Sequence, residues 1–178
     1  MYKRQTISPS NVVYLNETAA QASSGNSFGS TPTAPTNTVF SVGDKGDTNY
    51  GTMVAYCFAE VESYSKIGSY VGNGSSDGPF IYTGFRPAWL MIKDTTGSLD
   101  AWYINDNKRN TYNVVNGRLM ANLANDEATA LNICDFTANG FKIRTNDSGW
   151  NTSGSTYIFM AFSENPFGGS GVSPATAR

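Results

Sequence analysis

The chain has 178 residues, of which 13% are aromatic and 15% are charged, and its formal net charge is −2. This acidic balance, without any basic run, argues against binding of nucleic acid through phosphate contacts. Histidine does not occur, which excludes Ser-His-Asp, Cys-His and histidine-based zinc chemistry.

Short apolar runs at even spacing predict strands along the whole chain. In chain order they cover residues 12–15, 38–42, 52–59, 67–71, 79–83, 88–93, 101–105, 118–121, 132–136, 140–145 and 155–163. The clusters of Gly, Asn, Asp and Ser between them are typical of turns, and residues 125–131 predict one helical turn at most. The abundant aromatic and β-branched residues fit the pleated surface of a sheet. The sequence therefore predicts an all-β fold, an antiparallel β-sandwich of the jelly-roll type.

The predicted strand at 88–93 is apolar on both faces for most of its length. Its side chains alternate between the faces, with Ala88, Leu90 and Ile92 on one and Trp89, Met91 and Lys93 on the other. Such a strand is expected to be covered on both sides. Lys93 is expected to mark the point where the strand meets water.

Two segments about a hundred residues apart carry the same strand pattern. When residues 51–60 are written over residues 155–164, Thr52 meets Thr156, Val54 meets Ile158, Phe58 meets Phe162 and Glu60 meets Glu164. Upstream of each copy, the run "TVFSV" matches "NGFKI", and Asn16 matches Asn122. This order indicates weak internal repetition. We therefore expect residues 11–65 to be the truncated C-terminal half of one unit and residues 66–168 to be a complete sandwich.

The two ends of the chain are expected to lie outside these units. The first five residues, "MYKRQ", resemble the translation of an adaptor used to prepare sequencing libraries, so residues 1–10 are interpreted as a remnant and a disordered start. Residues 169–178 are expected to form a flexible tail. The chain contains no apolar run long enough to cross a membrane, so no membrane insertion is expected.

The stretch "GTMVAYCFAEVESYSKIGSYVGNGSSDGPFIYTGFRPAWLMIK" and the later "AWYINDNKRN", "NGFKIR" and "STYIFMAFSENPF" resemble tandem-repeat structural proteins of marine tailed phages, cyanophages among them. The resemblance runs from about residue 11 onward. It implies a concanavalin-like or SPRY-like sandwich. It also implies a virion protein without catalytic residues, made in the cytoplasm of a bacterial host.

Three functions follow as hypotheses. The first is a non-enzymatic virion component, such as a tail fibre, an appendage or a surface decoration, with other virion proteins as partners and a homo-oligomeric state. The second is a carbohydrate-binding module that recognises a glycan on the host surface. The third is a glycan-cleaving enzyme, which would need Glu60 and Glu62 in a cleft. Because Glu164 recurs where Glu60 stands, these glutamates are interpreted as structural, and no enzyme is expected.

The candidate ligand-binding residues lie in two polar loops. Trp150 stands among Asn146, Asp147 and Asn151, and Tyr50 follows Asp44 and Asp47 in the matching loop of the first half-unit. A flat ring beside amides and carboxylates suits stacking on a sugar face. The alternative is that Trp150 folds back and shields the core.

The same two loops raise the question of a cation. Carboxylate and amide oxygens close together on one loop are what calcium prefers, but Asp and Asn also favour turns for local reasons. We predict no cofactor and no metal site, with calcium as the alternative. Both cysteines, Cys57 and Cys134, stand in apolar runs and are expected to be buried free thiols.

The missing strands of the first unit would leave an unpaired sheet edge. Residues 11–60 are therefore expected to be less ordered than the rest, or to dock on the complete unit.

Overall fold

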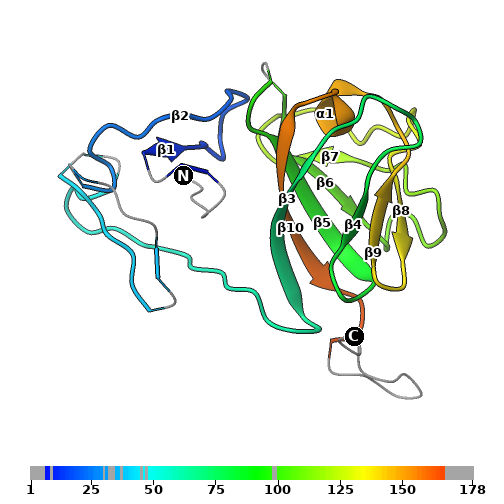
Figure 1. Ribbon diagram of the computed structural model, residues 1–178, viewed down its shortest axis with the longest axis horizontal. Coiled ribbons are helices and arrows are strands. Elements are labelled where there is room, and N and C mark those ends of the chain that lie inside the picture. The colour runs from blue at the N-terminus through cyan, green and yellow to red at the C-terminus, as the bar shows by residue number, and fades with distance from the viewer. Residues whose placement is uncertain are drawn as a thin grey trace.

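The computed structural model of the chain describes residues 7–8, 10–29, 31, 35–36, 38–44, 46, 48–97 and 100–166. Two antiparallel sheets stacked face to face make up the C-terminal part, and a small N-terminal part lies beside it (Figure 1). The prediction of an all-β sandwich is confirmed. The expected adaptor remnant, Met1–Gln5, and the expected tail, 169–178, lie outside the described residues.

The larger sheet has five antiparallel strands in the order β3-β10-β5-β6-β7. Their bounds are Ser65–Val71 (β3), Pro87–Asp94 (β5), Tyr103–Asp106 (β6), Leu119–Met120 (β7) and Thr156–Ser163 (β10). The last strand in sequence, β10, lies between β3 and β5 and pairs with both. The end of the chain thus joins two strands that lie far earlier in sequence.

The smaller sheet has three antiparallel strands in the order β4-β9-β8. They are Phe80–Tyr82 (β4), Cys134–Thr137 (β8) and Gly140–Ile143 (β9). Side chains from both sheets meet in one core, where the rings of Phe141 on β9 and Phe159 on β10 pack edge to face at 5.2 Å. Gly68 on β3 makes room for Phe159, because a Cβ at residue 68 would lie 2.2 Å from that ring.

The alternation predicted for residues 88–93 is confirmed. Leu90 and Ile92 point into the core between the sheets, and Met91 points to the opposite face, where it packs against a second apolar cluster. That cluster consists of Ile7, Val13, Trp102 and Ile158. The strand is therefore covered on both faces, as expected.

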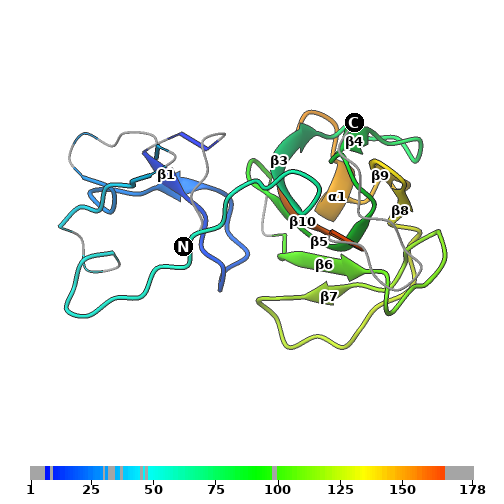
Figure 2. The same ribbon diagram turned by 90° about the horizontal axis from the view of Figure 1, so that it is seen from below.

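The outer cover comes from the N-terminal part of the chain. Its two short strands, Asn11–Val12 (β1) and Ala22–Ser23 (β2), pair with each other and lie beside the five-stranded sheet in both views (Figures 1 and 2). The indole Nε1 of Trp102 donates to the carbonyl oxygen of Tyr14 at 2.9 Å. This part of the chain was expected either to be less ordered than the rest or to dock on the complete unit, and the structure shows docking.

The expectation that Lys93 meets water is wrong, because the N-terminal part of the chain docks over it. Its side chain is fully buried, and its Nζ donates to the carbonyl oxygens of Asp94 at 2.7 Å and Thr18 at 3.2 Å. Burial lowers the pKa of this ammonium group. The sequence shows a charge at the end of an apolar run, but it does not show that another segment will cover that charge.

Two predicted strands, 38–42 and 52–59, do not form. Val54 and Phe58 are 75% and 58% exposed, and no described residue between 38 and 60 belongs to a strand. A strand is stable only beside neighbouring strands, and no strand in the described part of the chain pairs with residues 38–42 or 52–59. For the same reason Cys57 is exposed, whereas Cys134 is buried as predicted.

The one helix among the described residues is also not where the sequence placed a helical turn. Residues 125–131 form no helix, while Ser148–Asn151 form a single turn, α1. This turn lies within the loop that was predicted to bind a ligand.

Candidate functional site

The predicted ligand loop closes one end of the sandwich as helix α1 (Figure 1). Asp147 is the N-cap of this turn, and its Oδ1 accepts a hydrogen bond from the backbone N–H of Gly149 at 3.0 Å. Such a cap satisfies a backbone donor that the helix leaves free. The carboxylate of Asp147 is therefore engaged in closing the loop.

Trp150 is fully buried under this turn. Its ring lies 4.1 Å from the ring of Tyr103, centroid to centroid, and the guanidinium carbon of Arg118 is 5.2 Å from the indole centroid. A ring in this position presents no face to a sugar. The geometry corresponds to the alternative interpretation, in which Trp150 shields the core.

Asn151 is also fully buried, and it connects two loops. Its Nδ2 donates to Asn73 Oδ1, to the carbonyl oxygen of Ser75 and to that of Thr145, at 3.0, 2.7 and 2.9 Å. Its Oδ1 accepts from the backbone N–H of Asn73 at 2.8 Å. All of this hydrogen-bonding capacity is therefore directed inward.

The other predicted residues are not gathered around Trp150. Tyr50 is 81% exposed, and Asp44 and Asn146 are exposed, while Asp47 lies outside the described residues. The segment around residue 50, cyan in Figure 1, lies in the N-terminal part and away from α1. The structure therefore does not form one site from the two predicted loops.

A cluster of acidic groups lies beneath α1. Asp94 is buried, and its Oδ1 accepts from the backbone N–H groups of Thr96 and Gly97, both at 2.8 Å. Burial, and then the nearby Asp94 carboxylate, raises the pKa of Asp100. Within the described residues, no group of three or more His, Cys, Asp or Glu side chains is placed to hold a metal ion.

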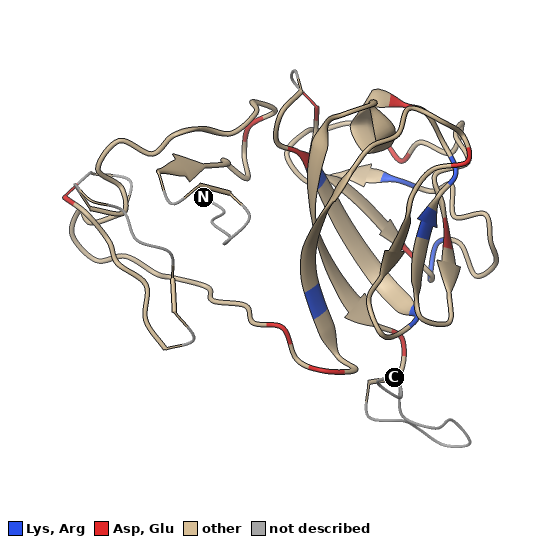
Figure 3. Cartoon of the chain, in the orientation of Figure 1, with Lys and Arg blue, Asp and Glu red and all other residues tan. Residues whose placement is uncertain are grey.

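Of the two glutamates that were considered for catalysis, Glu60 lies in an ion pair, with its Oε2 2.7 Å from Lys66 Nζ, and Glu62 is exposed. Glu164, which the sequence analysis matched with Glu60, has its Oε2 2.7 Å from Arg86 Nη1. Other charged side chains are spread over the elements rather than gathered on one face (Figure 3). Among the helices that could be described, none is long and apolar enough to span a bilayer.

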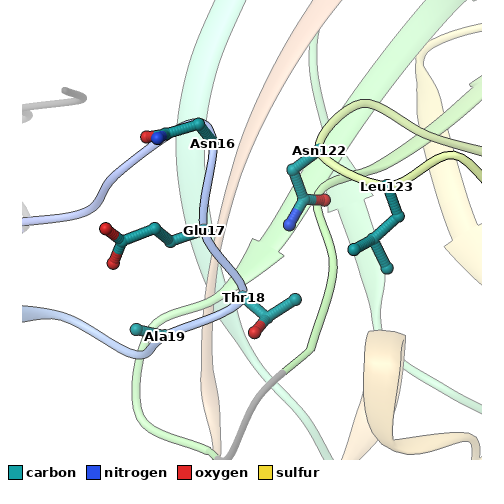
Figure 4. A pocket seen from close by; sticks show the side chains of 6 residues that line it. All are labelled: Asn16, Glu17, Thr18, Ala19, Asn122 and Leu123. Carbon is teal, nitrogen blue, oxygen red and sulfur yellow. The ribbon is translucent and has the colours of Figure 1, made fainter.

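A groove that the sequence did not predict runs between residues 15–19 and residues 121–124 (Figure 4). Two adjoining hollows, of about 390 and 550 Å³, make up this groove. Both are lined by Asn16, Asn122 and Leu123. The sequence analysis matched Asn16 with Asn122, but that match predicted no groove between them.

Asn122 lines both hollows. Its Oδ1 accepts from the backbone N–H of Trp102 at 2.9 Å, while its buried Nδ2 has no hydrogen-bond partner among the described residues. Figure 4 shows this nitrogen directed toward the segment that carries Thr18, whose side chain also faces the space between the two segments.

Comparison with known proteins gives one result. A family model described as a domain of unknown function (DUF7483) matches residues 1–166. No curated protein and no solved structure matches the chain.

Proposed function

The chain belongs to the DUF7483 family, whose function is unknown, and we propose that it is a non-enzymatic structural module of a phage virion, in a tail fibre, an appendage or a surface decoration. The sequence resemblance to virion proteins motivates this role. In this role, consecutive sandwich units along one chain build an extended assembly with other virion proteins and with further copies of the chain.

The observation that carries the proposal is a segment that has the residues of a strand but joins no sheet. Residues 52–60 repeat the pattern of β10, yet their side chains are exposed. In β10, Tyr157, Ile158 and Phe159 are at most 3% exposed. A segment with the residues of a central strand fits a chain in which a preceding unit supplies the flanking strands.

The contacts of the complete unit support the same role. The outer face of its larger sheet is covered by residues that precede it, through Ile7 and Val13. At its end loops, Trp150 and Asn151 are used to close the fold. Both surfaces hold parts of the chain in place, which is what a unit within a repeating array requires.

Adding a copy of the half-unit that the repeat predicts tests the repeat. A copy of residues 61–116 placed directly before Asn11 would supply counterparts of β3, β4, β5 and β6 to residues 11–60. We expect the amides of 52–60 to exchange at least about tenfold more slowly than in the present chain, because about 1.4 kcal/mol of protection corresponds to a factor of ten. Hydrogen exchange read by mass spectrometry measures this.

The matched control is the same fusion with Met53→Asp. Met53 matches Tyr157, which points into the core between the sheets, so a carboxylate there should prevent the strand from entering a second sandwich. Unchanged exchange of residues 52–60 in the unsubstituted fusion would contradict the repeat.

The virion location has its own test. An antiserum against the purified chain should label purified particles of the phage that encodes it, at fixed positions in negative-stain electron micrographs. Serum absorbed with the purified chain is the control. Antigen found only in the soluble lysate, with none on the particles, would rule out the virion role.

A further inference from the structure

We propose that residues 52–56 of one copy of the chain pair with the free edge of strand β3 in a second copy. The added strand extends the larger sheet of one molecule into the next, which is a common way for one chain to recognise another. This contact goes beyond the virion role and does not depend on it, because both surfaces belong to the chain as it stands.

Strand β3 has a partner on one side only. It stands at the end of the five-stranded sheet, next to β10 (Figure 2). On the β10 side, the backbone N–H of Gly72 donates to the carbonyl oxygen of Ser155 at 2.9 Å. Because the backbone groups of successive residues in a strand point to alternate sides, those of Ser69 and Val71 point away from β10. No strand in the described part of the chain pairs with them there.

Nothing in β3 itself protects this edge. The strand is seven residues long, its sequence "SKIGSYV" contains no proline, and its register against β10 has no bulge. Proline and bulges are among the usual means by which proteins keep an edge strand from pairing with another chain. At its start the edge already forms one antiparallel bridge, in which the N–H groups of Val61 and Ser65 each donate to the other residue's carbonyl oxygen, at 3.2 and 2.9 Å. The edge therefore suits an antiparallel partner.

The segment that fits this edge is residues 52–56. All five residues are exposed, Val54 by 75% and Tyr56 by 84%. Their sequence repeats the pattern of residues 156–160 in β10, the strand that already pairs with β3 in this molecule. In the register that β10 uses, Val54 of one copy lies opposite Ser69 of the other. Pairing removes apolar side chains from water and provides partners for the backbone groups of the edge.

The contacts at the two ends of the segment favour a second copy over the same chain. At one end the ring of Phe58 packs against that of Phe162 at 6.4 Å, and Phe162 lies on the outer face of the sheet together with Ile158. At the other end Thr48 Oγ1 donates to the carbonyl oxygen of Ser27 at 2.6 Å, in the N-terminal part. The segment thus crosses from the N-terminal part to the start of β3 (Figure 1). It is held away from its own edge, while a second copy can reach it.

The segment and the edge are two different surfaces of one chain. Each copy therefore offers one of each, so the contact is heterologous and can continue from copy to copy.

Cross-linking between two single-cysteine variants tests the pairing. One variant carries Val54→Cys and the other Ser69→Cys, both in a Cys57→Ser background in which the remaining Cys134 is buried. Opposite residues of a hydrogen-bonded antiparallel pair have Cα atoms about 5.5 Å apart, a distance that a disulfide spans. After mild oxidation of the mixture we expect a disulfide between the two variants, identified by mass spectrometry of the linked peptides.

The matched control replaces Val54→Cys with Met53→Cys. The side chain of Met53 points to the opposite face of the added strand, so this variant should give little linked product with Ser69→Cys. Three results would overturn the proposal. They are no link between the variants, equal linking from positions 53 and 54, and linking of Ser69→Cys only to itself, which would mean that two β3 edges pair with each other.

Sedimentation equilibrium measures the association of the unchanged chain without a cross-link. We expect the average mass to rise with concentration above the 19.1 kDa of one chain. Tyr56→Lys should weaken the association about tenfold, because it removes an aromatic side chain from the contact. The matched control is Tyr112→Lys, since Tyr112 is also 84% exposed but lies in neither surface.

A mass of one chain at every concentration, or equal effects of the two tyrosine substitutions, would contradict the proposed contact. Neither result decides the fusion test or the particle labelling, which follow a single molecule and the virion. The two proposals can therefore fail separately.

Discussion

Replacing Trp150 with alanine is expected to lower the free energy of unfolding by about 3–5 kcal/mol, the range typical of a buried aromatic side chain. The indole is fully buried, packs against Tyr103 at 4.1 Å and lies under the guanidinium of Arg118. Removing it leaves a cavity beneath α1 that a turn of four residues cannot fill. Urea denaturation followed by far-UV circular dichroism measures the change.

The matched control is Tyr50→Ala. Tyr50 is the aromatic residue of the other loop that was predicted to bind a ligand and is 81% exposed, so its removal should change stability by no more than about 0.5 kcal/mol. If both variants unfolded at the same urea concentration as the unchanged chain, Trp150 would not be part of the core. The alternative, a ring exposed for stacking on a sugar, would then return.

The complete sandwich could be predicted from the sequence to within one or two residues at most strand ends. Strands β5 and β10 show why, since their alternating apolar residues face two covered sides, and both boundaries fall at turn residues. Residues 52–59 carry the same signal as β10 and form no strand. The local pattern of apolar residues shows which secondary structure a segment prefers. Whether a neighbouring strand exists to pair with it depends on the rest of the chain.

Burial of polar residues could not be predicted in the same way. Lys93 was expected in water and is fully buried because the carbonyl of Thr18 lies beside it. One of its two acceptors is 75 residues away in sequence and is a backbone atom, so no side-chain pattern indicates it. Asn122 is similar, since the direction of its side-chain amide is set by the backbone N–H of Trp102.

The loop around Trp150 was correctly predicted as polar and connected to the sandwich end, but its chemistry was ambiguous. Asp and Asn residues in such a loop can hold a cation, bind a sugar or close a turn. Here Asp147 caps α1 and Asn151 connects two loops. The same side-chain groups serve all three purposes, so only the positions of their partners distinguish them.

Asn151→Ala is the second substitution with a large expected effect. The amide of Asn151 donates to three oxygens, one of them the carbonyl of Thr145, and accepts from the backbone N–H of Asn73. Alanine would leave several of these groups without a partner in a buried place. Each such group costs about 1–3 kcal/mol, and partial relaxation of the loops reduces the sum, so we expect a loss of about 2–4 kcal/mol.

The neighbouring Asn146→Ala is the control, because Asn146 is exposed in the same loop and should cost no more than about 0.5 kcal/mol. Chemical denaturation measures the free energy, and hydrogen exchange shows where the loss occurs. The amides of Asn73 and Gly74, which donate to Asn151 Oδ1 and to its carbonyl oxygen, should lose protection first. Equal losses in the two asparagine variants would mean that the loop as a whole, rather than the amide of Asn151, holds the two connected loops together.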